Sequence, residues 1–160
     1  VISETFDFMK ASVLSKSNGV ESDIPRRVQV IRKGVGRRPI VNENDLTAVL
    51  TTQDCAAVYP GDLSYEEQIQ LFDRADVIVA QHGGALTNIG FCRPGAKVLE
   101  IVGETYVNPC FWGIGHICGV RYAATRATAV DRSNIRDKNS PATVDVETTL
   151  DVYKKLIALP

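Results

Sequence analysis

The chain has 160 residues, 44% of them hydrophobic, and its 18 lysines and arginines nearly balance its 19 aspartates and glutamates. This length and composition are typical of one globular domain. The near-zero net charge excludes a global field that attracts nucleic acid or an anionic membrane, and no apolar run reaches the roughly 18 residues of a membrane-spanning helix. We therefore expect neither a nucleic acid partner nor a direct membrane span.

The predicted elements alternate between short apolar strands and amphipathic helices. Helices are expected at residues 2–15, 43–50, 65–75, 85–91, 108–118 and 144–159. Strands are expected at residues 27–31, 55–59, 77–80, 97–102 and 121–124, with a charged loop at 131–141. This alternation predicts an α/β fold, in which helices cover both faces of a Rossmann-like, doubly wound parallel sheet. The short strand at 55–59 is expected to be buried.

Two of the predicted helices have recognisable start signals. Ser64 and Glu67 have the spacing of a capping box, in which each side chain accepts a hydrogen bond from the other residue's backbone N–H. Asn42 is expected to cap the helix that begins at Glu43.

Three loops are expected to meet at the carboxyl ends of the strands, where ligands bind in sheets of this kind. The first loop, residues 32–38 (RKGVGRR), has four cations and two glycines. The second follows the apolar strand VIVA and contains Gln81, His82, Gly83 and Gly84; the third contains residues 103–105. Glycines at a helix start let an anion approach free backbone N–H groups. Cations beside such groups favour a phosphate ester as ligand, although two glycines also suit a tight turn.

Two titratable residues have functional and structural interpretations. His82 can donate a hydrogen bond to a phosphate oxygen or hold its loop, and a role as general base is the less favoured alternative. Glu100 lies in an otherwise apolar strand, so it either faces outward at an edge or is a buried carboxylate paired with an arginine or a ribose. His116, four residues after Trp112, is expected to pack on its helix.

The four cysteines show no CxxC pair, and the chain has two histidines, so a zinc site is not expected. Buried free thiols are the expected state. The alternative is a disulfide, for which Cys110 and Cys118 are the candidate pair.

The segments RKGVGRRPIVNENDL and SYEEQIQLFDRADVIVAQHGGALTNIGFCRPGAKVLEI resemble the signature of the family 61 glycosyltransferases, and the match in order and spacing covers residues 27–101. The resemblance implies an inverting transferase of the GT-B type, with two Rossmann-like domains. In such a protein the C-terminal domain holds a nucleotide sugar, commonly a uridine diphosphate (UDP) sugar, and no tightly bound metal is needed. It implies that residues 1–160 are this donor domain, and that the N-terminal domain on the acceptor side is absent.

The resemblance also implies roles for individual residues. His82 is placed at the catalytic centre. The residues implied in binding the donor and its phosphates are Arg32, Arg37, Arg38, Asn42, Glu43, Gly83, Gly84, Ala85, Thr87, Asn88 and Glu100. The expected partners are a nucleotide sugar and a glycan or polysaccharide acceptor.

The cellular setting and the function have alternatives. Because no Asn-x-Ser/Thr acceptor is present, a bacterial cytoplasmic protein of polysaccharide biosynthesis is favoured over a eukaryotic one in the Golgi or endoplasmic reticulum. A Rossmann oxidoreductase is disfavoured because GVGRRP has proline where a dinucleotide motif needs helix entry. A non-catalytic module that binds a phosphorylated ligand or a protein remains the other alternative. The sugar, the acceptor and the catalytic base are not encoded in these motifs.

Overall fold

A computed structural model describes residues 2–15, 24–32, 38–133 and 136–160. In this part of the chain, six strands form one sheet in the order β2-β1-β3-β4-β5-β6. The strands are β1 (Arg27–Val30), β2 (Ala56–Val58), β3 (Val77–Gln81), β4 (Lys97–Gly103), β5 (Arg121–Ala129) and β6 (Ala142–Val144). β1 to β5 pair in parallel and β6 runs antiparallel to β5. The expected Rossmann-like α/β fold is confirmed, with an antiparallel edge strand that the sequence patterns did not predict.

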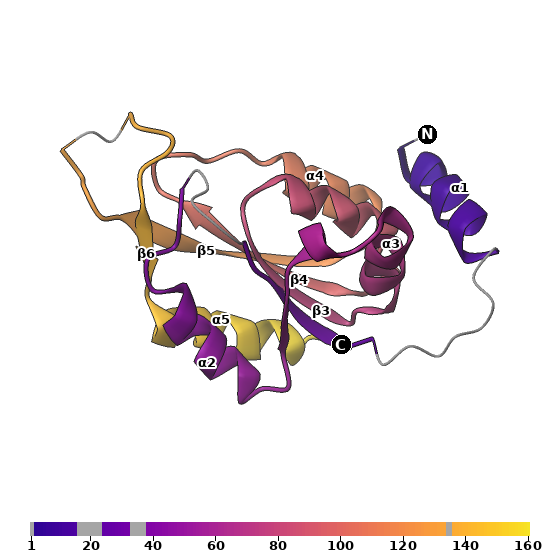
Figure 1. The fold of residues 1–160 in the computed structure, drawn as a ribbon, viewed down its shortest axis with the longest axis horizontal. Helices are drawn as coiled ribbons and strands as arrows, with labels where there is room; N and C mark the ends of the chain where they lie inside the picture. The colour runs from indigo at the N-terminus through magenta and orange to yellow at the C-terminus, as the bar shows by residue number, and fades with distance from the viewer. Residues whose placement is uncertain (1, 16–23, 33–37, 134–135) are drawn as a thin grey trace.

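Helices cover both faces of the sheet (Figure 1). The helices are α1 (Ile2–Leu14), α2 (Glu43–Thr51), α3 (Tyr65–Arg74), α4 (Cys110–Ile117) and α5 (Val146–Ile157), with 3-10 helices η1 (Pro60–Asp62) and η2 (Gly84–Phe91). α3, η2 and α4 pack on one face, and α2 with α5 on the other. α1 lies beside α3 and η2, where Phe6 contacts Phe91 edge to face at 5.1 Å between ring centroids.

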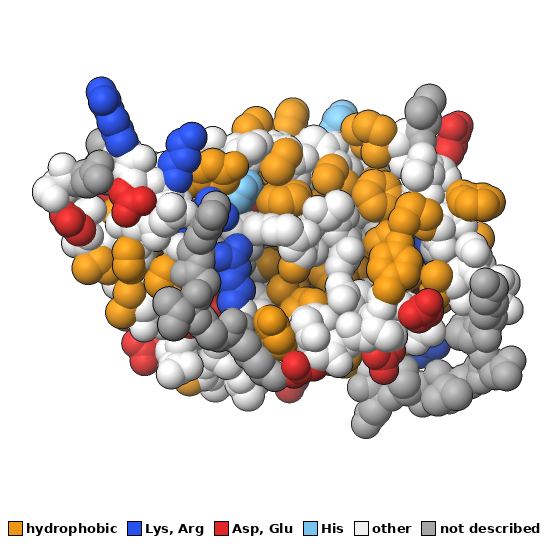
Figure 2. Space-filling model, turned by 45° about the horizontal axis from the view of Figure 1, so that its top comes forward, with side chains coloured by type: hydrophobic (Ala, Val, Ile, Leu, Met, Phe, Trp, Pro, Cys, Tyr) orange, Lys and Arg blue, Asp and Glu red, His pale blue; other side chains and the backbone are white. Residues whose placement is uncertain are grey.

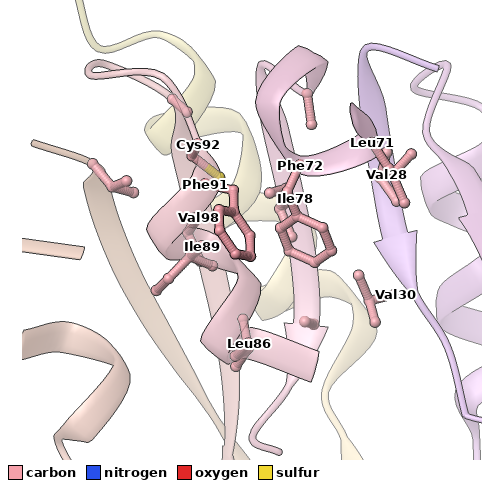
Figure 3. Close-up of a cluster of buried hydrophobic side chains, with 14 of the residues drawn as sticks. Val28, Val30, Leu71, Phe72, Ile78, Leu86, Ile89, Phe91, Cys92 and Val98 are labelled. Carbon is pink, nitrogen blue, oxygen red and sulfur yellow. The ribbon is translucent and has the colours of Figure 1, made fainter. Parts of the chain in front are cut away.

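The alternation of side chains along each strand divides the core between the two faces. Val28, Ile78 and Val98 point to the α3 and η2 side, where Figure 3 shows them around Phe72 and Phe91. Val77, Val79 and Leu99 point to the α2 and α5 side. Because both faces are covered, the central strands are buried along almost their whole length, which explains their continuous apolar sequences.

Local signals explain where the helices begin. The capping box at α3 is confirmed: the Glu67 backbone N–H donates to Ser64 Oγ, and the Ser64 backbone N–H donates to Glu67 Oε2. Asp145 caps the start of α5, where its carboxylate accepts from the Thr148 backbone N–H at 2.8 Å.

Other predictions need correction. The expected strand at 55–59 is an edge strand whose Ala56 and Ala57 are exposed, because β2 has a neighbour on one side only. The helix expected at 85–91 is a 3-10 helix, η2. The strand expected at 121–124 extends to Ala129 because its second half pairs with β6, and the helix expected from residue 144 begins later for the same reason.

The strand order creates a crevice at one point of the sheet edge. From β1 the chain crosses to β2 on one side, and it then returns to place β3 on the other side of β1. The connections that leave β1 and β3 therefore diverge, and ligands of doubly wound sheets bind at such a switch point beyond the carboxyl ends of the strands. In this chain the switch point lies between Arg32 and His82.

Candidate functional site

The loop after β1 lies against the loop after β3 at both of its described ends. At one end, Arg32 Nη2 donates to the backbone oxygen of His82 at 2.6 Å. At the other end, Gln81 Nε2 donates to the backbone oxygen of Arg38. The expected convergence of these loops is therefore present. Arg37 was also predicted to bind the donor, but it lies outside the described residues.

Gly83 and Gly84 have different structural reasons for lacking a side chain. A Cβ atom at Gly83 would lie 1.9 Å from Arg32 Nη2. The missing side chain of Gly83 therefore leaves room for the Arg32 guanidinium. A Cβ atom at Gly84 would meet no heavy atom within 4 Å, so this position is open. The first hydrogen bond of η2 runs from the Leu86 N–H to the Gly83 oxygen, which leaves the N–H groups of Gly84 and Ala85 outside the helix's own pattern.

His82 and Glu100 form a buried pair between β3 and β4. His82 Nδ1 is hydrogen-bonded to Glu100 Oε1, and the two side chains are 6% and 1% exposed. Glu100 is therefore the buried carboxylate of the two alternatives, but its partner in the structure is a histidine and not the expected arginine. The His82 ring also lies against the rings of Tyr106 and Phe111, at centroid distances of 5.2 and 4.9 Å.

Burial and nearby cations both act on this pair. Burial raises the pKa of Glu100 to about 7, because a charged carboxylate loses its hydration there. Burial lowers the pKa of His82, and the positive charges of Arg38 and Arg32 lower it further. The pair therefore gains or loses a proton near neutral pH, in the range where a general acid or base is useful.

Arg38 combines an uncommon backbone conformation with a buried donor that is unpaired within the described part of the chain. Its backbone has φ 60°, a left-handed conformation that is uncommon for a residue with a side chain. Its guanidinium lies 4.5 Å from the centroid of the Tyr106 ring, and its buried Nε has no hydrogen-bond partner among the described residues. Buried donors are nearly always paired in native proteins, so an anion at this point would satisfy Arg38.

Glu43 is a carboxylate that interacts electrostatically with Arg32, the other described cation of the loop. Burial raises its pKa, while the charge of Arg32 and a hydrogen bond from the Arg32 backbone lower it. Burial also lowers the pKa of Arg32, with a further contribution from Arg38. Two cations and one carboxylate thus lie at the switch point. On the face drawn in Figure 2, Lys and Arg side chains gather beside a histidine, among apolar side chains.

Three residues predicted from the resemblance have other surroundings. Asn42 does not cap α2; its side chain pairs with the backbone N–H and oxygen of Val144, at 3.0 and 2.9 Å, and so joins this loop to β6. Asn88 donates to Gln68 of α3 at 3.0 Å. Thr87 is exposed on η2. Asn42 and Asn88 therefore have structural hydrogen bonds that account for their presence without a ligand.

Sequence reasoning missed the aromatic residues that surround His82. Tyr106 comes from the connection between β4 and α4, and Phe111 from the first turn of α4. Their position in the sequence could have indicated this, because both follow a central strand at the edge where the other two loops were expected to meet. By contrast, the rings of His116 and Trp112 stack on the outside of α4 at 5.8 Å, as predicted.

A cavity of about 120 Å³ opens beside Gly83 and Gly84. It extends from Arg32 towards Tyr59 and Gly61, which follow β2. A Cβ atom at Gly61 would lie 2.5 Å from the Tyr59 ring, so this ring packs on the glycine and forms one wall. The cavity therefore joins an aromatic wall on the β2 side to Arg32 and to the start of η2.

A larger cavity, about 430 Å³, lies at the opposite edge of the sheet. Its cations have structural partners: Arg27 donates to Gln53 O, and Lys97 donates to Ile157 O and Leu159 O. Arg93 donates to the oxygens of Asp73 and Arg74 at the end of α3. These side chains neutralise helix carboxyl ends, so the smaller cavity at the switch point is the better candidate site.

The cysteines do not contribute a reactive group to this site. Burial raises the pKa of the Cys55 thiol to about 11 and that of Cys92 to about 12, which confirms the expected buried thiols at these positions. Cys110 is exposed and Cys118 half-buried, and both are free.

No group of three or more His, Cys, Asp and Glu side chains within the described ranges is arranged to hold a metal ion. None of the helices in the described part of the chain is long and apolar enough to cross a membrane.

Comparison with known proteins identifies the family. The model of glycosyltransferase family 61 matches residues 1–99, which is more than half of the chain. The chain belongs to glycosyltransferase family 61. The match includes the described ends of the basic loop and the HGGALTN segment, and it ends just before Glu100. The recognition made from these motifs is thus confirmed.

The individual relatives have low sequence identity to this chain. The chain is 27% identical over 105 residues to an EGF domain-specific O-linked N-acetylglucosamine transferase of Canis lupus familiaris, covering 62% of this chain and 20% of that protein. The corresponding protein of Gallus gallus is 26% identical over 105 residues, covering 62% and 19%. Beta-1,2-xylosyltransferase RCN11 of Oryza sativa subsp. japonica is 34% identical over 62 residues, covering 39% and 12%.

The matched region spans about a fifth of the length of the vertebrate relatives. These relatives, and the rice protein, are eukaryotic. The expectation of a bacterial cytoplasmic setting, which relied on missing glycosylation acceptors, gains no support from them.

Proposed function

We propose that this chain is the donor-binding domain of a family 61 glycosyltransferase, and that its ligand is a nucleoside diphosphate sugar, with UDP as the nucleotide. The observation that carries the proposal is that both described ends of the loop after β1 contact the chain just before Gly84, Arg32 at His82 and Gly83 and the Arg38 backbone at Gln81. Family membership supplies the class of reaction, and this geometry supplies a place for the diphosphate.

We place the diphosphate between the cations and the open end of η2. Arg38 offers a buried Nε that no other described residue pairs with, and Gly84 offers a backbone N–H with no side chain above it. Charge-assisted hydrogen bonds from guanidinium and backbone N–H groups are the strongest that neutral-pH proteins offer to a phosphate. The nucleoside then extends along the cavity towards Tyr59, where an aromatic ring can cover one face of the base.

The chemistry that these residues contribute is stabilisation of a leaving group. When the acceptor attacks the sugar carbon, the bond to the β-phosphate oxygen breaks and negative charge accumulates on UDP. Fixed cations and N–H groups stabilise that charge more in the transition state than in the bound donor. We propose that Arg32, Arg38 and the Gly84 N–H do this without a metal ion, and that His82 donates a hydrogen bond to a phosphate oxygen.

The acceptor and its base are proposed to come from another part of a longer protein. His82 lies beneath Tyr106 and beside the cations, on the side of the proposed leaving group. A base that deprotonates the acceptor belongs on the opposite side of the sugar in an inverting reaction. We therefore propose that a preceding domain supplies the acceptor groove, and that the described chain alone binds donor but transfers sugar poorly.

The relatives suggest candidates for the sugar, the acceptor and the setting. Their names specify transfer of N-acetylglucosamine to EGF domains and transfer of xylose. We propose a UDP ester of one of these sugars as donor and a glycan or glycoprotein as acceptor. Because these relatives are eukaryotic, the proposed setting is the lumen of the Golgi or endoplasmic reticulum.

Isothermal titration calorimetry with UDP and with NAD tests this function. Wild-type protein should bind UDP and not NAD, and Arg38→Ala should weaken UDP binding tenfold or more. Arg26→Ala is the matched control, because Arg26 pairs with Asp76 on the surface, where both side chains are more than half exposed. Binding of NAD in place of UDP would support an oxidoreductase, and binding of neither nucleotide would support a non-catalytic module.

A further inference from the structure

The side chains of Glu100 and His82 form a pair that is almost completely buried. Glu100 is 1% exposed and lies in the middle of β4, where its neighbours Leu99 and Ile101 are core residues. An isolated carboxylate in such a position costs several kcal/mol, so the hydrogen bond to His82 Nδ1 is essential to it. This bond also fixes which nitrogen of His82 faces away from Glu100, namely Nε2.

The number of protons on the pair decides what His82 Nε2 can do. With one proton, the stable arrangement is a charged Glu100 that accepts a hydrogen bond from Nδ1–H of a neutral His82. Nε2 then carries a lone pair and accepts hydrogen bonds. With two protons, Nε2 carries a hydrogen, whether the shared proton resides on Glu100 or on Nδ1. The two-proton pair is therefore a donor towards the site, and the one-proton pair is an acceptor.

The surroundings of the pair are charged on the side of the proposed phosphates. Within the described residues, the charged and titratable groups that face His82 are Glu100 from β4, Arg32 and Arg38 from the two ends of the loop after β1, and Tyr106 from the connection to α4. The remaining ring contact is apolar Phe111. Lys138 Nζ lies 5.9 Å from the Tyr106 ring centroid. The cations disfavour the second proton while the site is empty.

We infer that binding of a nucleoside diphosphate draws one proton from solvent onto the pair of Glu100 and His82, with Glu100 acting as the positioning residue that makes His82 a hydrogen-bond donor to the ligand. This inference rests on the proposed function. A diphosphate beside Arg32 and Arg38 cancels the positive field that opposes the second proton. An anionic phosphate oxygen also accepts a hydrogen bond from Nε2–H but repels a lone pair on Nε2, so it favours the protonated nitrogen. Donor binding and proton uptake are thus coupled.

The direction of the pKa shifts sets the pH at which the coupling is visible. Burial raises the pKa of Glu100 to about 7, and burial with the two arginines lowers the pKa of His82. At pH 8 the empty site therefore holds the one-proton pair, and ligand binding adds the second. Linkage of one proton means that affinity falls about tenfold for each pH unit above this range.

Calorimetry in buffers of different ionisation enthalpy measures proton uptake directly. At pH 8, binding of UDP-N-acetylglucosamine and of UDP-xylose is compared in HEPES, Tricine and Tris, and the dependence of the measured heat on the buffer gives the number of protons taken up. These esters lack the terminal phosphate that titrates near pH ~6 in free UDP, so the protons are those of the protein. The expected uptake is between about 0.5 and 1 proton per ligand.

Two variants locate the proton. Glu100→Gln should still bind but take up less than ~0.2 proton, and its affinity should be flat between pH 7 and 9. Glu43→Gln tests the other carboxylate of the switch point, whose pKa burial also raises and which lies beside Arg32, so protons are counted per bound ligand whatever its affinity. It should keep the wild-type uptake. A merely structural role for Glu100 would change stability and affinity but would leave proton uptake unchanged.

The outcomes separate this inference from the proposed function. Binding without proton uptake by the wild type overturns the inference while donor binding stands, and this measurement is decisive even if Glu100→Gln fails to fold. Uptake that is lost in Glu43→Gln, or kept in a folded Glu100→Gln, overturns it as well. If neither UDP ester nor UDP binds, the proposed function fails, and the coupling fails with it.

Discussion

Replacing Gly84 by valine should abolish nucleotide binding while leaving the fold almost unchanged. A Cβ atom at this position meets nothing within 4 Å, and the residue is exposed at the start of η2. The free energy of unfolding should therefore change by less than about 1 kcal/mol, the usual range for substitutions in open surface positions. For a chain of this length, that corresponds to a shift in Tm below about 4 °C.

The expected loss of binding follows from the hydrogen bonds that the side chain would block. A valine above the N–H groups of Gly84 and Ala85 keeps a phosphate oxygen from both donors. A hydrogen bond to a charged group contributes about 1.5–3 kcal/mol, so losing two of them costs at least ~3 kcal/mol, or on the order of 100-fold in Kd. Calorimetry with UDP and differential scanning calorimetry measure the two quantities separately.

Two control variants make the Gly84 experiment interpretable. Gly113→Val in α4 also adds a side chain where a Cβ atom has open space, and it should affect neither binding nor Tm. Gly83→Ala should damage both, because its Cβ atom would displace Arg32 from the His82 oxygen. Unimpaired UDP binding by a stable Gly84→Val protein would show that the phosphate is not at the start of η2, and the reasoning would be refuted.

Three further changes test other parts of the structure. Asn42→Ala should lower the free energy of unfolding by about 1–3 kcal/mol in urea titrations, since it leaves the Val144 backbone groups unpaired, and UDP affinity measured on the folded protein should change little. Arg38→Lys should weaken UDP binding, because an ammonium cannot reproduce the guanidinium fork; affinity equal to wild type would contradict this. Glu100→Gln should remove a pH dependence of stability. The pKa of Glu100 rises from 4.5 to about 7 on folding, so the folded state holds its proton more tightly. Wild-type stability relative to Glu100→Gln should then fall by up to about 3 kcal/mol between pH 5 and 8, and a rise would reverse the sign of the argument.

Local patterns in the sequence predicted most of the elements, because neighbouring residues determine them. The capping box of Ser64 and Glu67 fixes the start of α3 through contacts within one turn. The apolar run before His82 predicts a strand covered on both faces, and β3 is such a strand. Loop convergence also followed, since parallel strands bring their carboxyl ends to one edge of the sheet.

The parts that were missed depend on contacts between distant residues. β6 has three residues and exists because it pairs with the extended end of β5, which no local pattern encodes. Asn42 has the sequence position of a helix cap, but a tertiary contact 102 residues away takes its side chain. Pairing of Glu100 with His82 required the register of β3 against β4, in which Ala80 lies beside Glu100.

Nuclear magnetic resonance with ¹⁵N-labelled protein tests the central claim most directly, because it reports each backbone N–H separately. On titration with UDP, the largest shifts should occur at the amides of Gly83, Gly84 and Ala85, with smaller changes at Arg32 and Arg38. Shifts confined to the opposite edge of the sheet, around Arg27 and Lys97, or no shifts at any UDP concentration, would contradict a diphosphate site at the switch point.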